Sequence, residues 1–327
     1  SFFRLYMVDT ETSRFRKWGV GMARKTGMDE AARRFDSLER PEGIILNLDA
    51  DCTVERNYFR RVYEGMSAAV EKSACSLYFE HPLQGSKFPD PVYRAIAQYE
   101  LHLRYYYQGL RFAGFPHAHH TVGSAIAVKA LPYVRSGGMN RRMAGEDFYF
   151  VQKLVSAGGY FNLNTTAVYP SPRPSMRVPF GTGATISRLT ENGEEEFMTY
   201  SPEAFLELRS FFKMTDPLYD SGSPGNSYLY SELPASVRLF TSNEEWIMSL
   251  CEIKGNTASG KSFRKRFFDW FNMFRIVKYM NFVHQDLMKR KPVTEAAYEL
   301  INEGGYDIKP GDAAILLGHY RLLEKEF

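Results

Sequence analysis

The stretch LNLDADCTV, residues 46–54, places two aspartates, Asp49 and Asp51, one residue apart directly after an apolar run. Neighbouring carboxylates repel each other and a buried strand gains nothing from them, so their position indicates that they hold a ligand. Two chemistries use such a D-x-D pair at the end of a strand. One binds a divalent cation together with a nucleoside diphosphate, and the other attacks a phosphate ester.

The second chemistry is that of haloacid-dehalogenase-type phosphatases, which Asp49, Asp51 and Thr53 resemble. In that family the first carboxylate is the nucleophile and the second is the general acid or base. Such an enzyme also needs a downstream lysine and a late strand that ends in Gly-Asp. The candidate pairs here, at Gly145 and Gly311, do not follow strand-like sequence. The match stays local, and the phosphatase is the weaker hypothesis.

The segments around the pair alternate between strand and helix patterns. Strands are predicted over residues 44–48, 73–80 and 120–130 and within 160–174, where the strand runs into a Pro-rich loop, and helices over 19–35, 55–72 and 90–112 and from Glu146 onwards. Such alternation is typical of an α/β fold with a mostly parallel sheet, in which ligands bind at the carboxyl ends of strands. Strand signals fade after residue 184. We therefore expect a catalytic domain over residues 1–184 and a mainly helical region over residues 185–327.

Four segments are similar to one family. GVGMARKTGMDEA, IILNLDADCTVERNYF, GSAIAVKALPYVRSGGM and GEDFYFVQKLVSAGG resemble, in that order, family 2 glycosyltransferases of the GT-A fold, in their bacterial nucleotide-sugar type. The resemblance covers roughly residues 17–184. It implies a metal-dependent, inverting transfer of a hexosyl or N-acetylhexosaminyl group to an acceptor hydroxyl, as in polysaccharide biosynthesis. The alternative is a catalytically inactive GT-A-like domain that binds a sugar or a protein.

The resemblance implies a role for each acidic residue. Asp51 becomes a ligand of Mg²⁺ or Mn²⁺, and Asp49 contacts the nucleotide ribose or the metal's shell. Asp147 becomes the base that takes the proton of the acceptor hydroxyl. Glu146 either acts beside it or serves only as an acid at a helix start. Because a helix N-terminus stabilises a carboxylate, we expect Asp147 to be a modest base.

Other residues match the family more loosely. Gly123 and Ser124 resemble the segment that borders the donor sugar, or they serve backbone packing. Asp9 resembles an acidic contact to the nucleotide, and Arg173 and Arg177 follow the last predicted strand, where family members keep a basic loop near the diphosphate. The strand that forms the base pocket is not recognisable, so we expect it to be missing from this sequence. The expected donor is a nucleotide-sugar, with a UDP-sugar favoured, and the expected acceptor is a sugar or a lipid-linked molecule.

Two clusters leave their roles open. His117, His119 and His120 could bind a metal, line the acceptor site or simply lie exposed. In residues 261–291 basic and aromatic residues are interleaved, as in an amphipathic helix that lies on an anionic membrane. Packing against the rest of the chain explains the aromatic residues equally well. Peripheral contact with a membrane is therefore one expected interaction.

The composition limits the classes of protein. With 327 residues, 44% of them hydrophobic and 24% charged, the chain has the composition of a soluble globular protein. A net charge of +3 and the absence of a known nucleic-acid module argue against nucleic acid as a partner. The three cysteines are widely separated, which predicts free thiols in a reducing compartment and no zinc site. We expect a cytoplasmic protein, with contact to the inner face of the membrane as one option.

Overall fold

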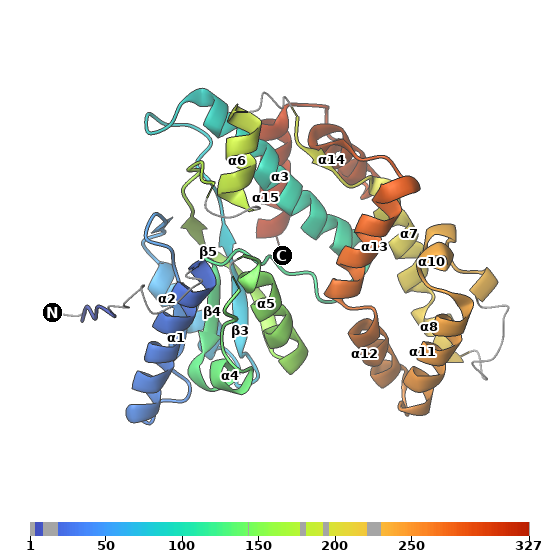
Figure 1. Cartoon of the computed structure of the whole chain (residues 1–327), viewed down its shortest axis with the longest axis horizontal. Helices are drawn as coiled ribbons and strands as arrows, with labels where there is room; N and C mark the ends of the chain where they lie inside the picture. The colour runs from blue at the N-terminus through green and yellow to red at the C-terminus, as the bar shows by residue number, and fades with distance from the viewer. Residues whose placement is uncertain are drawn as a thin grey trace. The chain divides into compact units, whose positions relative to one another are not determined.

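The computed structural model describes residues 4–8, 19–142, 144–176, 181–191, 196–220 and 230–326. The chain forms two compact units. The first comprises Ser1–Ile96, His119–Gly193 and Leu323–Phe327, and the second comprises Ala97–Ala118 and Glu194–Leu322. Each unit draws on residues from both sides of position 184, where the sequence suggests a boundary. The mixed α/β composition that the sequence predicts is confirmed (Figure 1).

A five-stranded sheet with the order β1-β4-β3-β5-β2 forms the centre of the first unit. Its strands are Ile44–Asn47 (β1), Thr53–Val54 (β2), Ala74–Phe79 (β3), Ile126–Lys129 (β4) and Tyr160–Tyr169 (β5). Every residue of β3 and β4 is buried. The apolar character of these two segments is what a strand covered on both faces requires.

The sheet is mixed, which corrects the expectation of a mostly parallel one. Among the described strands, β3 and β5 pair in parallel, whereas β1 with β4, β3 with β4 and β2 with β5 pair antiparallel. Strands β1, β3 and β5 share one direction, and β4 is inserted between β1 and β3 in reverse. After β3 the chain runs through helix α3 (Asp90–Phe112) and a loop, and β4 begins at the same edge of the sheet at which β3 ends. Hydrophobic periodicity predicts the helix but not the edge to which the chain returns.

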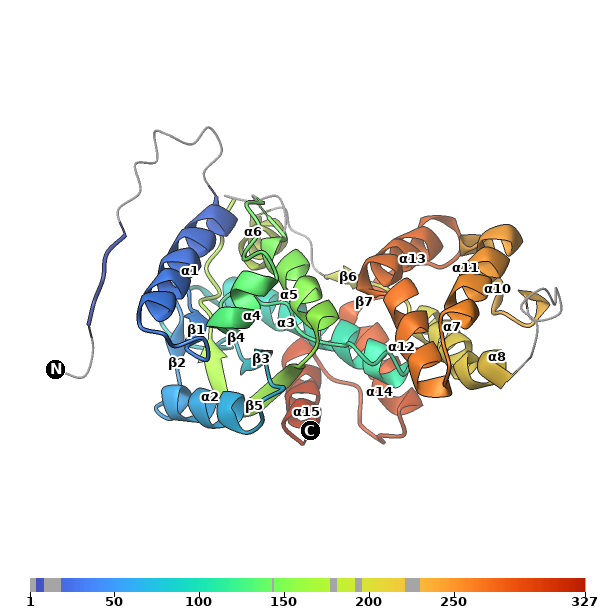
Figure 2. The same cartoon turned by 90° about the horizontal axis from the view of Figure 1, so that it is seen from below.

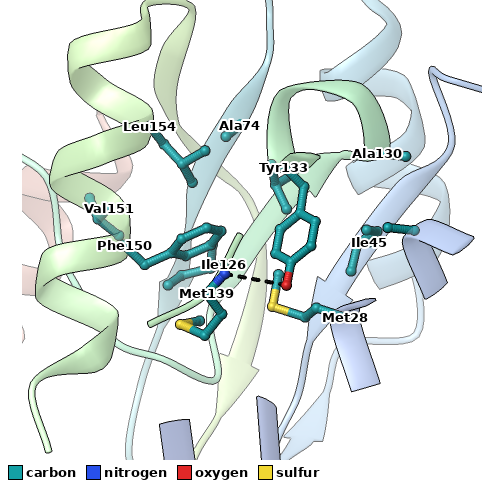
Figure 3. Close-up of a cluster of buried hydrophobic side chains, with 12 residues drawn as sticks. Met28, Ile45, Ala74, Ile126, Ala130, Tyr133, Met139, Phe150, Val151 and Leu154 are labelled. Carbon is teal, nitrogen blue, oxygen red and sulfur yellow. Dashed lines mark hydrogen bonds between the residues drawn. The ribbon is translucent and has the colours of Figure 1, made fainter. Parts of the chain in front are cut away.

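Three helices cover one face of the sheet, namely α1 (Val20–Ser37), α4 (Ala130–Arg135) and α5 (Glu146–Ala157). Their apolar side chains meet those of the strands in one cluster, which includes Met28, Ile45, Ala74, Ile126, Tyr133, Phe150 and Leu154 (Figure 3). The Tyr133 hydroxyl accepts a hydrogen bond from the Met139 N–H at 3.2 Å and donates one to Asp29 at 2.6 Å. This packing holds α1 and the first turn of α5 on the same face.

Helix α2 (Tyr58–Ser67) packs against β5 and buries Tyr58, Val62 and Met66. Gly65 of α2 lies so close to Leu163 of β5 that a Cβ at position 65 would overlap the leucine side chain. Helix α6 (Thr182–Glu191) completes the described helices of the first unit. The helix α2 that follows the D-x-D pair therefore packs directly on the sheet.

The second unit is mainly helical (Figure 2). Besides part of α3 and of α15 (Ala313–Lys325), it contains α7 (Pro202–Lys213), α8 (Thr215–Asp220), α10 (Ala235–Phe240), α11 (Asn243–Gly255), α12 (Gly260–Trp270), α13 (Met273–Asp286), α14 (Val293–Glu303) and the short strands β6 (Met198–Thr199) and β7 (Lys291–Pro292). Its core is rich in aromatic rings, among them Phe211, Phe212 and Trp246. Across the described residues, no helix has the length and apolar character needed to cross a membrane.

The basic and aromatic segment 261–291 is two helices rather than one. Asn272 separates α12 from α13, and its side chain accepts hydrogen bonds from the N–H groups of Phe274 and Arg275. The aromatic residues Phe263, Phe267 and Phe268 are at most 1% exposed, so packing in the core accounts for them. The exposed side chains of α12 are the basic Lys261, Arg264, Lys265 and Arg266 together with the acidic Asp269.

Candidate functional site

One edge of the sheet gathers the residues that the sequence singles out. Because β1, β3 and β5 run in one direction and β4 runs in reverse, the carboxyl ends of the first three lie at the same edge as the start of β4. Asp49 and Asp51 follow β1 at this edge, Gly123 and Ser124 precede β4, and Arg173 follows β5. This is the edge at which α/β sheets bind ligands.

Arg24 of α1 joins the D-x-D pair to the Glu-Asp pair. Its Nη2 donates to Asp49 Oδ1 at 3.1 Å and Oδ2 at 3.0 Å, and its Nη1 donates to Glu146 Oε1 at 2.5 Å. The side chains of Arg24 and Glu146 are 12% and 3% exposed, so this ion pair is largely buried, whereas that of Asp49 is 41% exposed. Two acids that are far apart in the sequence therefore share one guanidinium group.

Asp147 stands beside Glu146 in the first turn of α5. Gly145, in the left-handed conformation with φ 69°, turns the chain so that the helix begins at Glu146. The Asp147 carboxylate accepts hydrogen bonds from the N–H groups of Phe148, at 2.7 Å, and Gly123. These bonds orient the side chain toward the loop before β4.

Burial raises the pKa of Asp147 to about 6, and the neighbouring charge of Glu146 acts in the same direction. Arg24 and the two N–H groups lower the pKa, but they do not outweigh burial. This shift is opposite in direction to the lowered proton affinity that the helix N-terminus alone suggests. A carboxyl group with a pKa near neutrality is better suited to accept a proton than an exposed aspartate.

Gly123 and Ser124 each make a contact in this cluster. An added Cβ at Gly123 would overlap the Arg24 guanidinium, so only glycine lets the arginine pass at this point. The buried hydroxyl of Ser124 makes a hydrogen bond with the thiol of Cys52, whose pKa is raised by burial. The loop before β4 thus contacts Arg24, Asp147 and the segment that contains the D-x-D pair.

Asp51 lies on the open side of the cluster. Arg173 Nη2 contacts Asp51 Oδ2 at 3.2 Å, and the two side chains are 51% and 39% exposed. An exposed ion pair of this kind contributes little stability and exchanges readily with other partners. Of the two carboxylates, Asp51 therefore loses less stabilising interaction when it exchanges its partner for a new ligand.

The donor atoms allow a simple test of whether a divalent cation fits. Among the described residues no group of three His, Cys, Asp or Glu side chains is arranged to hold a metal ion. Mg²⁺, however, is often held by one or two carboxylates and completes its shell with phosphate oxygens and water. Asp51, if released from Arg173, would supply one carboxylate to such a cation, whereas Asp49 is engaged by Arg24.

The three histidines do not form one site. The pKa of His117 is lowered by burial, and the charges nearest to it are Asp269 and Lys265. His119 Nδ1 lies 2.9 Å from Asn162 Oδ1, and His120 Nε2 lies 3.1 Å from both carboxylate oxygens of Glu324. The side chains of His119 and His120 thus have different partners, and metal binding by the trio gains no support.

Two residues of the predicted site, Asp9 and Arg177, lie outside the described residues. Sequence reasoning missed Arg24, although it lies in a segment that resembles the family. The available signal was its position on the helix. Arg24 precedes Met28 by four residues and Ala32 by eight, so it shares the buried stripe of α1. An arginine on a buried stripe requires acidic partners.

Compared with protein-family models and with curated proteins, the chain matches none of them. The function has to be argued from the geometry of the cluster.

Proposed function

We propose that the first unit transfers a sugar from a nucleoside-diphosphate donor, with a UDP-sugar favoured, to an acceptor hydroxyl, with inversion at the anomeric carbon. The observation that carries the proposal is the pairing of Arg24 with both Asp49 and Glu146. It brings the D-x-D pair, which suits a nucleotide and a cation, next to Asp147, which suits a proton acceptor. A GT-A-like fold is part of the same proposal, and the mixed sheet is compatible with it.

In this proposal Asp147 holds the acceptor hydroxyl and takes its proton as the oxygen bonds to the anomeric carbon. The bond from that carbon to the diphosphate breaks, and the leaving nucleoside diphosphate keeps the electron pair. Asp51 would hold Mg²⁺ or Mn²⁺, and the bound cation would supply positive charge against the growing negative charge of the diphosphate. Arg24 keeps Asp49 and Glu146 in place, and Gly123 aligns the carboxylate of Asp147 through its N–H group.

The phosphatase hypothesis finds less support. A nucleophilic Asp49 would need one oxygen directed at the phosphorus atom, but Arg24 engages both of its oxygens. Hydrolysis of p-nitrophenyl phosphate that is lost in Asp49→Asn would favour it. A domain that binds a sugar or a protein without transferring anything is the remaining alternative.

The test is the melting temperature with UDP and with GDP, each with and without Mn²⁺. A ligand that binds only the folded state raises the melting temperature by mass action. We expect a metal-dependent rise with one nucleotide, its loss in Asp51→Ala, and its retention in Asp36→Ala, which changes an exposed aspartate at the end of α1. A melting temperature that responds to neither nucleotide in the presence of Mn²⁺ would contradict the proposal. Sugar transfer from the nucleotide that binds then separates an enzyme from a binding domain.

Membrane contact through residues 261–291, if it contributes to acceptor binding, rests on charge alone. Lys261, Lys265 and Arg266 of α12 are exposed, whereas its phenylalanines are not available for insertion. We therefore expect weak binding to phosphatidylserine vesicles that disappears at high salt and in Lys265→Glu. Salt-independent binding would contradict this picture.

A further inference from the structure

The last turn of the chain lies against the sheet edge that bears the acidic cluster. Residues 323–326, here called the C-terminal turn, belong to the first unit although most of α15 does not. Within this turn Glu324 is only 3% exposed. A carboxylate buried to this degree requires specific partners.

Glu324 and its neighbour Lys325 make contacts to three different segments. Both oxygens of Glu324 lie 3.1 Å from His120 Nε2, and its backbone carbonyl accepts a hydrogen bond from Asn164 Nδ2 at 2.7 Å. Lys325 Nζ lies 2.7 Å from Glu80 Oε1, directly after β3. The C-terminal turn is thus held by β5, by the end of β3 and by the loop before β4.

His120 is in turn held from two other directions. The Ser76 hydroxyl of β3 donates to the His120 carbonyl at 2.6 Å, and the His120 ring meets the Phe79 ring edge to face at a centroid distance of 5.1 Å. The interaction with Glu324 adds a third contact, on the side of the ring that faces the C-terminal turn. Position 120 is therefore fixed by side chains that are remote from it in the sequence.

Three residues after His120 the same loop reaches the acidic cluster. Gly123 donates its N–H to Asp147 and leaves space for the Arg24 guanidinium, and Ser124 binds the Cys52 thiol. A short loop transmits a displacement at one end to the other when side chains anchor both ends. A displacement of the C-terminal turn can therefore be transmitted through this loop to Asp147 without any change in the sheet.

We infer that Glu324 is a positioning residue, which clamps the loop 119–124 through His120 and thereby holds Gly123 against Asp147 and Arg24. The cluster is a transfer site only under the function proposed above, but the clamp concerns the geometry of the cluster itself. Loosening the C-terminal turn should open the loop and expose what the loop covers, with the strands still in place.

Cys52 offers a direct readout, because its thiol contacts Ser124 of this loop. Cys75 in β3 is fully buried and reports unfolding of the sheet, and Cys251 is exposed and reports the activity of the reagent. The experiment measures the rate of maleimide addition at each cysteine by peptide mass spectrometry in wild type, Glu324→Gln and Glu324→Ala. Glu326→Gln, in the same turn but exposed, is the matched control.

We expect Cys52 to react at least about five times faster in both Glu324 variants, with Cys75 and the control unchanged, as for a local opening. The inference is overturned if the Cys52 rate stays at the wild-type value, or if Cys75 accelerates together with Cys52. The same variants should weaken Mn²⁺-dependent nucleotide binding without abolishing it. Should wild type bind no nucleotide, the proposed function fails, while the rate at Cys52 still decides on the clamp.

Discussion

Arg24 donates from Nη2 to both carboxylate oxygens of Asp49 while its Nη1 reaches Glu146. Burial by itself lowers the pKa of Arg24, but the charges of Asp49, Asp147 and Glu146 outweigh burial and raise the pKa. The guanidinium group of Arg24 therefore remains charged over the whole pH range in which the protein is folded. Three acids share this single cation, and the electrostatic balance of the cluster depends on it.

Replacing Arg24 by Met should destabilise the protein by about 3 kcal/mol at pH 8, because a largely buried ion pair loses one partner. The loss should be smaller at pH 5, which lies below the pKa of Asp147 of about 6, because one of the negative charges near the lost cation is then neutralised. Urea denaturation at the two pH values measures both effects. Arg33→Met is the matched control, since Arg33 lies on the same helix with a 63% exposed side chain and pairs with Glu30. A loss of stability below about 1 kcal/mol, as for an exposed ion pair, would contradict a largely buried ion pair between Arg24 and Glu146.

Asp147→Asn should make the protein more stable above pH 6. Burial raises the pKa of Asp147 from 3.8 to about 6, so the folded state binds its proton more tightly than the unfolded state does. The wild type therefore loses stability as pH rises between these two values, by on the order of 1–3 kcal/mol, and the variant does not. The carbonyl oxygen of asparagine can still accept the hydrogen bond from Phe148.

Melting temperatures of wild type and Asp147→Asn between pH 3.5 and 8 provide the check, with Asp36→Asn as the control. The gap between the two proteins should open as pH rises, and a gap of constant size would show that Asp147 does not titrate in this range. Under the proposed function the rate of sugar transfer should rise with pH through about 6 in the wild type and be lost in the variant.

Part of the site could be predicted from the sequence because strand ends and helix starts are local features. The apolar run before Asp49 predicts a strand, and the acids at Glu146 and Asp147 predict a helix start, and both elements are present. The expected burial on both faces is wrong for β1, in which only Ile45 and Asn47 are buried. That the two elements meet depends on the packing of α1 and α5 on one face of the sheet. The position of Arg24 on the buried stripe of α1 predicts that it has acidic partners. Which acids these are depends on the tertiary packing and could not be predicted from the sequence.

Other features depend on where the chain returns after a long connection. The reversed direction of β4 and the burial of Glu324 against His120 involve residues that are far apart, and neither leaves a periodic signal. The break at Asn272, by contrast, was open to prediction. Asparagine before an apolar run is a common N-cap, and here its side chain caps α13.

Gly123→Ala should destabilise the protein by about 1–3 kcal/mol, as overpacking of a filled site does. The added methyl group would overlap the Arg24 guanidinium, which is held by Asp49 and Glu146 and cannot move without breaking an ion pair. Gly27→Ala on α1 is the matched control, because a Cβ there meets nothing within 4 Å. Alanine in the middle of a helix should stabilise by about 0.5–1 kcal/mol relative to glycine. Urea denaturation measures the free energy of unfolding of both variants. If both substitutions changed it in the same direction, the close approach of Gly123 and Arg24 would be refuted.

The second unit should lose stability in mild acid through His102. Burial lowers the pKa of His102 to about 4, with a smaller contribution from Arg290, and its Nδ1 lies 2.7 Å from the Thr199 hydroxyl. The unfolded chain therefore binds a proton that the folded chain does not, in the range between the ordinary histidine pKa of about 6.5 and that value. By linkage, the free energy of unfolding falls as pH drops through this range, by on the order of 1–3 kcal/mol.

His102→Asn keeps a polar partner for Thr199 and removes the titrating group, so its stability should depend less on pH. Chemical denaturation at pH 7.5, 6, 5 and 4.5 compares this variant with wild type, and His319→Asn on α15 is the control histidine. We expect the curves of wild type and of the control to descend together while that of His102→Asn descends less. If His102→Asn followed the wild type down to pH 4.5, the acid sensitivity would have to come from other groups, and the neutral His102 of the folded state would be ruled out as its cause.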